Sequence, residues 1–159
     1  MYHEKQKGLF CGQHALNNLF QEKKFYSDKM NKNTLVNNQG QFNLRGFCNF
    51  LDQNNLIGGV SCCSDNGNYL LEAIHGSIEW FGFKTKLLDI EHPVDDNDMG
   101  IPHIQYCYEK LNIYLDDPNL LGIIVRTGSP NSSESAHYWC ALKKEDEFFI
   151  VDSMFNDIL

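Results

Sequence analysis

The sequence has no surplus of basic residues and no apolar run long enough to cross a membrane. Its formal net charge is -8, from 13 Lys and Arg residues against 21 Asp and Glu residues. A nucleic acid partner is therefore not expected, because binding to phosphates needs a basic surface. The amino-terminal residues are polar and charged, unlike the apolar core of a signal peptide. We expect no membrane association and a cytoplasmic location, or a nuclear one.

The spacing of the six cysteines lacks the signature of a metal site. None of them forms a Cys-x-x-Cys pair; they lie at positions 11, 48, 62, 63, 107 and 140. The adjacent Cys62 and Cys63, even with Cys48 and His75, do not reproduce the paired spacing of a zinc site. We expect no metal and no cofactor. We also expect reduced thiols, since a domain of this size without a secretion signal has little use for disulfides.

What the sequence does contain is typical of a folded domain. Hydrophobic residues make up 42% of the 159 residues and aromatic residues make up 13%. This composition is sufficient to bury a core without crosslinks. The chain has no internal repeat, no long low-complexity tract and no composition typical of a linker. A single domain over residues 1–159 is therefore expected.

The hydrophobic periodicity changes from helical to strand-like along the chain. Helices are predicted over residues 11–22, around residues 42–51, and from the N-cap candidate Asn68 to Gly82. The later part predicts a strand over 84–88, a loop over 89–101, a helix over 104–115, a buried strand over 120–125, a loop over 128–135 and strands over 138–143 and 147–151. Helices followed by strands indicate an α+β fold with an antiparallel sheet.

The hairpin formed by the last two predicted strands brings a histidine near a carboxylate. A symmetric hairpin centred between Lys144 and Glu145 places His137 directly opposite Asp152. Opposed residues of an antiparallel pair point to the same face, with Cβ atoms about 4.5–5.5 Å apart. We therefore expect the side chains of His137 and Asp152 to meet.

The amino-terminal segment supplies a candidate nucleophile. Cys11 comes just before an apolar periodic segment, so it lies at or near a helix N-terminus, where the partial positive charge favours the thiolate. A cysteine hydrolase needs this thiolate, a base, a group that orients the base and donors for the oxyanion. These roles are assigned, in that order, to Cys11, His137, Asp152, and Gln6 with the Cys11 backbone N–H. Each residue taken alone is also compatible with an ordinary structural role.

Motifs at these residues resemble those of the Josephin family of deubiquitinating enzymes. The run CGQHALNNL, from Cys11 to Leu19, looks like the catalytic-cysteine motif of that family. His137, followed by an aromatic strand and then Asp152-Ser153, resembles the second motif. The sequence GNY at 67–69 is similar to the smaller Josephin proteins in particular.

The resemblance implies a papain-like cysteine protease that cleaves isopeptide bonds after the ubiquitin C-terminus. The family's oxyanion glutamine, nucleophile, base and third catalytic residue match, in that order, Gln6, Cys11, His137 and Asp152. The expected partner is ubiquitin or a ubiquitin conjugate, and the expected state is a monomer. Two alternatives stay open. One is a related cysteine hydrolase or acyltransferase that acts on another substrate tail, and the other is a ubiquitin-binding module with weak or no catalysis.

Two features depart from the family pattern. Josephin proteins usually have tryptophan directly after the catalytic histidine, whereas here Tyr138 comes before Trp139. The chain also ends seven residues after Asp152, where the family continues into a further helix and strand. We expect either a reduced Josephin-like domain or a fragment without that C-terminal element.

Other residues near the motifs are expected to have structural roles. His14 lies one helical turn after Cys11, and we expect it to pack or to form hydrogen bonds rather than to catalyse. Four aromatic residues are expected in the core, and any exposed one is a candidate contact for ubiquitin. They are Trp80, Phe81, Phe83 and Trp139.

Overall fold

The computed structural model divides into two compact units, one made of Met1–Thr85 with Gly122–Leu159 and the other of Lys86–Leu121. The structure describes residues 1–8, 10–56, 62–63, 69–88, 109, 111–127 and 137–154. None of the helices in these ranges has the length and apolar character needed to cross a bilayer.

The second unit contains the end of a predicted helix. Residues 111–115 are helical, and the Lys86 ammonium lies 4.9 Å from the centroid of the Tyr114 ring. The last turn of the helix predicted over 104–115 is thus confirmed. The loops predicted over 89–101 and 128–135, and the N-cap candidate Asn68, lie outside the described residues.

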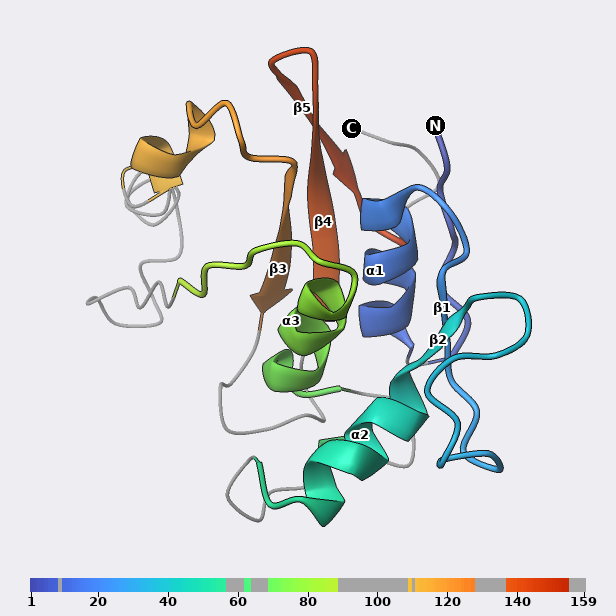
Figure 1. The fold of residues 1–159 in the computed structure, drawn as a ribbon. Helices are drawn as coiled ribbons and strands as arrows, with labels where there is room; N and C mark the ends of the chain where they lie inside the picture. The colour runs from blue at the N-terminus through green and yellow to red at the C-terminus, as the bar shows by residue number, and fades with distance from the viewer. Residues whose placement is uncertain are drawn as a thin grey trace, which may run out of the picture. The chain divides into compact units, whose positions relative to one another are not determined.

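The first unit carries all the candidate site residues. Figure 1 labels its helices and strands. Its elements are α1 (Cys11–Phe20), β1 (Phe25–Tyr26), β2 (Phe42–Asn43), α2 (Leu44–Gln53), α3 (Leu71–Trp80), β3 (Gly122–Thr127), β4 (His137–Lys144) and β5 (Glu147–Val151). The three helices precede the main sheet, which is antiparallel with the order β3-β4-β5. The predicted α+β organisation is confirmed, and β1 and β2 add a short parallel pair.

The strand β4 lies in the middle of the sheet and pairs with β3 without interruption. The ladder runs from Gly122 opposite Leu142 to Thr127 opposite His137. Tyr138 therefore causes no bulge. Its side chain is 1% exposed, and its hydroxyl donates to the Tyr69 carbonyl at 2.8 Å. The tyrosine that departs from the family pattern is thus a core residue of this fold.

The register predicted for the β4–β5 hairpin is wrong. The turn lies at Glu145 and Asp146, with φ of 50° and 68°, and the ladder runs from Lys144 opposite Glu147 to Cys140 opposite Val151. Two consecutive left-handed residues make a tight turn that matches the twist of the strands, and aspartate tolerates this conformation. The predicted hairpin was centred one residue too early, because no Gly or Asn marks the position of the turn in the sequence.

The error leaves the relation between His137 and Asp152 largely intact. In the observed register, the position opposite His137 falls two residues beyond Asp152. Because side chains alternate between the two faces of a sheet, a shift of two residues keeps both side chains on the same face. The two residues become diagonal neighbours instead of directly opposed ones.

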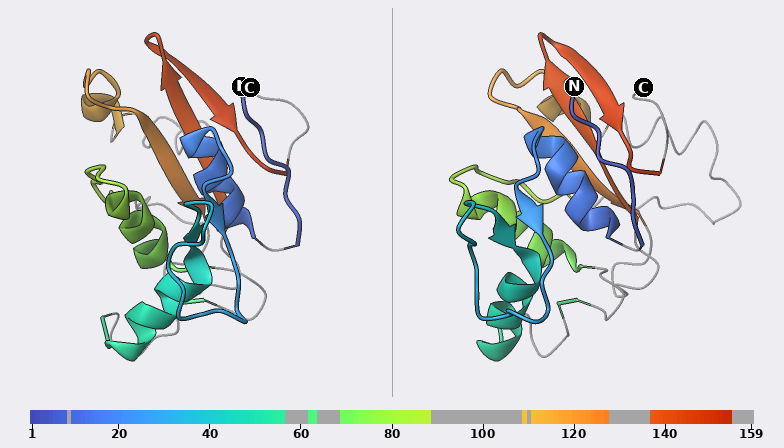
Figure 2. Two further views of the ribbon diagram at one scale, coloured as in Figure 1. Left: turned by 45° about the vertical axis from the view of Figure 1, so that its right-hand side comes forward. Right: turned by 90° about the vertical axis from the view of Figure 1, so that its right-hand side faces the viewer.

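Close packing fixes α1 between α3 and the sheet (Figure 2). A Cβ atom at Gly12 would lie 2.9 Å from Ile74 Cδ1 on α3 and 3.3 Å from the ring of Tyr138 on β4. The glycine next to Cys11 therefore allows α1 to approach both elements. The core around it includes Ala15, Leu16, Phe25, Phe42, Leu44, Ala73 and Ile74.

Three predictions for the middle and late parts of the chain need correction. Residues 84–88 form no strand, and no strand in the described residues pairs with them. Trp80 and Phe83 are 51% and 42% exposed, so they lie at the surface, although Ile78 in the last turn of α3 belongs to the core. Phe81 and Trp139 are half-buried. The strand predicted as buried over 120–125 is β3, which begins two residues later and is half-buried along most of its length.

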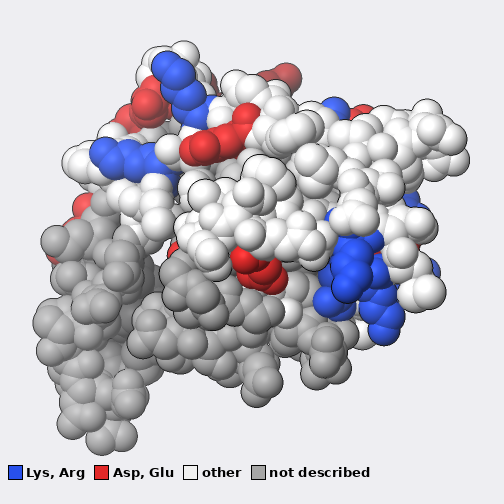
Figure 3. Space-filling view, turned by 60° about the horizontal axis from the view of Figure 1, so that its bottom comes forward, with Lys and Arg blue, Asp and Glu red and all other residues white. Residues whose placement is uncertain are grey.

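Charge is sparse on the face of the molecule shown in Figure 3. Uncharged residues cover most of the described area, a group of Lys and Arg side chains lies at the lower right, and basic and acidic side chains alternate at the upper left. Much of the acidic surplus of the sequence lies outside the described residues. It includes Asp89, Glu91, Asp95, Asp96 and Asp98.

Candidate active site

Cys11 is the first residue of α1 and lies where this helix meets β4. It is 3% exposed. Its thiol accepts hydrogen bonds from the backbone N–H groups of Tyr138, of Gly12 and of Cys11 itself. The N–H groups at a helix start have no partner within the helix, so they are available to a negative sulfur atom or to an oxyanion. The structure thus places Cys11 directly against the residue that follows His137.

The backbone N–H groups at the helix start favour the Cys11 thiolate, but burial of the thiol outweighs their effect. Burial raises the pKa of the thiol above its ordinary value, and the charge of Asp152 adds to the rise. The three backbone hydrogen bonds lower the pKa but do not outweigh burial, which disfavours the charged form. A neighbouring proton acceptor is therefore needed to form the nucleophile.

His137 begins β4 and contacts Asp152, which follows β5. His137 Nε2 lies 3.0 Å from each carboxylate oxygen of Asp152. Asp152 is 7% exposed, and its Oδ1 also accepts the N–H of Met154 at 3.0 Å. A carboxylate can only accept, so in the neutral ring Nε2 carries the proton and Nδ1 has a free lone pair. This is the tautomer that a base for a thiol requires.

Gln6 is hydrogen-bonded to Ser153, the residue that follows Asp152. Its N–H donates to the Ser153 carbonyl at 2.8 Å, and Ser153 Oγ donates to Gln6 Oε1 at 3.3 Å. Its Nε2 donates to the Gly8 carbonyl at 3.0 Å. The Gly8 carbonyl can only accept, so the side of the amide that faces it is the nitrogen, and the oxygen faces the Ser153 hydroxyl.

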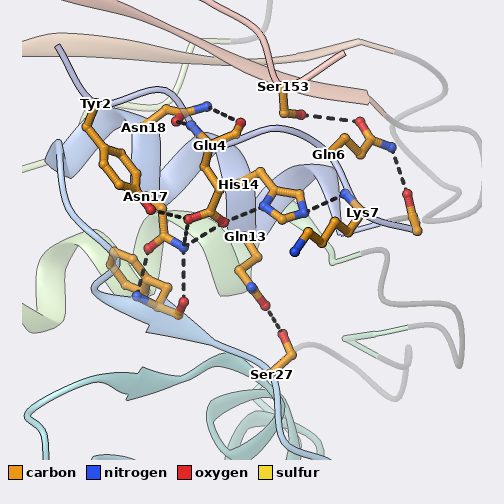
Figure 4. A network of polar contacts seen from close by, with 12 residues as sticks. Tyr2, Glu4, Gln6, Lys7, Gln13, His14, Asn17, Asn18, Ser27 and Ser153 are labelled. Carbon is orange, nitrogen blue, oxygen red and sulfur yellow. Dashed lines mark hydrogen bonds and ion pairs between the residues drawn. The ribbon is translucent and has the colours of Figure 1, made fainter.

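The four predicted site residues are connected by one direct contact and by contacts to Tyr138 and Ser153, the residues that follow His137 and Asp152. His137 and Asp152 are in direct contact, Cys11 contacts the backbone of Tyr138, and Gln6 is bonded to Ser153. They derive from the amino-terminal segment, from α1, from β4 and from the end of β5. The histidine of α1, His14, is buried and bonded through both ring nitrogens, as the sequence predicts (Figure 4).

Sequence reasoning missed two partners of these residues. Ser153 orients Gln6, and Glu4 bonds to His14. The only signal in the sequence was their position, because Ser153 directly follows Asp152 and Glu4 lies two residues before Gln6. Position alone does not predict that Ser153 contacts Gln6 or that Glu4 contacts His14.

The described residues contain no group of three His, Cys, Asp or Glu side chains arranged to hold a metal ion. Within the described ranges, no disulfide joins the five cysteines Cys11, Cys48, Cys62, Cys63 and Cys140. The candidate residues themselves supply a thiol, an imidazole, a carboxylate and amide donors. This set is suited to acyl transfer through a covalent thioester.

Comparison with known proteins assigns a family to this arrangement. The sequence model of the Josephin family matches residues 6–158, essentially the whole chain and all four candidate residues. No curated protein matches the chain. The chain therefore belongs to the Josephin family, whose domain has a papain-like fold and is of the deubiquitinase type of cysteine protease.

Proposed function

We propose that this protein is a thiol-dependent deubiquitinase that hydrolyses isopeptide bonds at the ubiquitin C-terminus. The observation that carries the proposal is the bond between His137 Nε2 and both carboxylate oxygens of Asp152, in a chain of the Josephin family. This bond leaves Nδ1 as the proton acceptor, and Cys11 lies against the backbone next to His137. Cys11, His137, Asp152 and Gln6 are the proposed catalytic residues.

In the first half of the reaction, His137 Nδ1 takes the proton of the Cys11 thiol. The sulfur atom then attacks the carbonyl carbon of the terminal glycine of ubiquitin, and the carbonyl oxygen becomes an oxyanion. The Cys11 N–H and the amide of Gln6 donate hydrogen bonds to this oxygen. Each such donor typically contributes about 3 kcal/mol to the transition state.

In the second half, the carbon–nitrogen bond breaks and the imidazolium of His137 protonates the leaving lysine amine. Cys11 then carries the ubiquitin acyl group as a thioester. His137 takes a proton from water, the resulting hydroxide equivalent attacks the thioester, and the sulfur leaves with the proton that His137 returns. Asp152 stabilises the imidazolium in both halves.

Hydrolysis of a defined ubiquitin–lysine isopeptide conjugate tests this proposal. We expect turnover by the wild-type protein and none by Cys11→Ala. Asp152→Ala should lower kcat by about 100-fold, since His137 loses its fixed tautomer. Asp152→Asn keeps an oxygen that accepts the Nε2–H and should lose less than Asp152→Ala.

Cys140→Ala is the matched control, because Cys140 is a buried thiol three residues after His137 on β4, and this spacing places the two side chains on opposite faces of the sheet. It should keep the activity of the wild type. A wild-type protein that binds ubiquitin but does not cleave the conjugate would contradict the proposal and favour a ubiquitin-binding module. Cleavage of another acyl substrate, but not of ubiquitin, would favour a related hydrolase.

A further inference from the structure

The amino-terminal segment, residues 2–7, is attached to α1 mainly by side chains (Figure 4). A backbone–backbone hydrogen bond from the Gln6 N–H to the Ser153 carbonyl joins it to the chain just after β5. The Glu4 N–H donates to Asn18 Oδ1 at 2.5 Å, and Asn18 Nδ2 donates to the Glu4 carbonyl at 3.2 Å. The segment that carries Gln6 therefore depends on α1 for its position.

The Glu4 carboxylate accepts hydrogen bonds from several groups. Asn17 Nδ2 lies 3.1 Å from each of its oxygens, and the Tyr2 hydroxyl donates to Oε2 at 2.5 Å. Burial alone would raise the pKa of Glu4, but the hydrogen bonds from His14, Tyr2 and Asn17 together hold it below its ordinary value. Glu4 is thus an ionised acceptor at neutral pH.

The buried ring of His14 forms hydrogen bonds with two residues of the segment, Glu4 and Lys7. Its side chain is 6% exposed. Nδ1 bonds to the Glu4 carboxylate, and Nε2 accepts the backbone N–H of Lys7 at 3.0 Å. An amide N–H can only donate, so Nε2 is unprotonated and the ring proton lies on Nδ1, directed at Glu4. The ring therefore needs this one neutral tautomer to make both bonds.

Gln6 lies between the two points that His14 holds. We propose that Glu4 and His14 are positioning residues for the oxyanion donor Gln6. The hydrogen bonds of His14 to Glu4 and to Lys7 fix the chain before and after Gln6, and the bond from Ser153 orients the Gln6 amide. An oxyanion donor acts only if it is held at the developing charge before the reaction, which requires a rigid support. This inference rests on the proposed hydrolase function of the same site.

The test is a double-mutant cycle between His14 and Gln6. Hydrolysis of ubiquitin carrying a fluorogenic C-terminal amide gives kcat and KM for wild type, His14→Leu, Gln6→Ala and the double variant. Removal of an oxyanion donor lowers kcat by about 100- to 1000-fold. We expect His14→Leu to lower kcat at least ten-fold with KM little changed. In the Gln6→Ala background, the same change should cost less than about two-fold.

Three further variants separate positioning from general loss of stability. His14→Gln keeps one donor and one acceptor and should restore most of kcat. Glu4→Gln keeps the shape of the side chain and repeats the cycle if His14→Leu does not fold. The matched control is His75→Leu on α3, since His75 forms an exposed pair with Glu79, with a distance of 3.7 Å between Nδ1 and Oε1. It should leave kcat unchanged.

Equal costs of His14→Leu in the two backgrounds would overturn the inference, because the histidine would then act independently of Gln6. Amide exchange, followed by NMR, gives a readout that needs no catalysis. In His14→Leu, we expect faster exchange of the Gln6 N–H, whose acceptor is the Ser153 carbonyl, while the amides of α3 stay protected. Unchanged exchange of Gln6 would also overturn the inference. A wild-type protein without turnover would instead contradict the proposed function, and the exchange result would still decide the positioning role.

Discussion

The thiol of Cys11 shows how burial and helix position act against each other at a single residue. Three backbone N–H groups point at the sulfur, as expected at a helix start, yet burial raises its pKa above the ordinary value. The start of the helix can be predicted from the sequence, because it depends on local periodicity. Burial of the thiol by Tyr138 and by the sheet cannot be predicted from the local sequence, because it depends on residues far along the chain.

The raised pKa predicts how Cys11 reacts with a small alkylating reagent. The thiolate is the reactive form, so a raised pKa means that it accumulates only as the pH rises through and beyond about 9. We expect the rate of Cys11 alkylation by iodoacetamide, measured on the peptide by mass spectrometry, to keep rising up to that pH. A rate that levels off below pH 7 would show a preformed ion pair with His137 and would contradict the prediction.

The pKa of Glu4 predicts a pH-dependent contribution to stability. The folded-state pKa is lower than the ordinary value, so the fold favours the ionised form. This stabilisation is complete above the ordinary pKa of a glutamate, about 4.3, and is lost as the pH falls through the folded-state value. The free energy of unfolding of the wild type should therefore decrease with falling pH in that window, and that of Glu4→Gln should decrease less.

Urea unfolding at several pH values provides the measurement. At pH 7, Glu4→Gln should be less stable by about 1 kcal/mol, since a charge-assisted hydrogen bond is replaced by neutral ones. The control Glu79→Gln alters an exposed carboxylate on α3 and should follow the wild type. Parallel pH curves for Glu4→Gln and wild type would show that the Glu4 network does not favour the ionised form.

At the scale of the elements, Tyr138 couples β4 to the segment before α3. Its hydroxyl is buried and donates to the Tyr69 carbonyl at 2.8 Å. Tyr138→Phe leaves that carbonyl without this donor and should lower the free energy of unfolding by about 1–2 kcal/mol. We expect kcat per folded molecule to stay near that of the wild type, because the Tyr138 backbone N–H still reaches Cys11.

Thermal and denaturant unfolding check this prediction, with Tyr26→Phe on the half-buried strand β1 as the control. The control should change stability by less than about 0.5 kcal/mol. An unchanged stability in Tyr138→Phe would mean that the hydrogen bond of the hydroxyl in the native state contributes no more than its hydration in the unfolded state.

The elements that could be predicted are those whose signal is local. The periodicity from Cys11 onward placed α1, and the bounds of β5 were predicted without error. The β4–β5 turn was misplaced because Glu145 and Asp146 adopt a left-handed conformation that their identity only tolerates. The strand predicted over 84–88 failed because a strand also needs a partner.

The candidate site shows the same limit. The roles proposed for Cys11, His137 and Asp152 rest on residue types and spacing, and the observed contact between His137 and Asp152 agrees with the expectation that their side chains meet. The predicted contact is observed despite the wrong register, because a shift of two residues keeps both side chains on the same face of the sheet. The bond between Gln6 and Ser153 joins the two ends of the chain, and no local pattern specifies it.

At the scale of the whole molecule, the distribution of charge bears on the substrate tail. Glu72 is exposed in the first turn of α3, and its negative charge acts on Tyr138, which borders Cys11. If the tail of ubiquitin, with its arginines, passes this point, Glu72→Lys should raise KM by about five-fold. That factor corresponds to about 1 kcal/mol for one exposed charge contact.

The measurement is KM for a ubiquitin C-terminal amide at low and at high salt. The effect of Glu72→Lys should shrink at high salt, because exposed charges are screened. Glu79→Lys, at the other end of α3, is the control and should leave KM unchanged. An equal KM for Glu72→Lys and wild type at low salt would exclude this residue from the path of the tail.

The central claim is that Cys11 is a nucleophile directed at the ubiquitin C-terminus. The most direct test is incubation with full-length ubiquitin that bears a C-terminal electrophile, read by intact mass and by mapping of the modified peptide. Our account predicts a single ubiquitin adduct on Cys11, absent in Cys11→Ala, weaker in His137→Ala and unchanged in Cys140→Ala. The absence of an adduct, or an adduct on another cysteine, would contradict it.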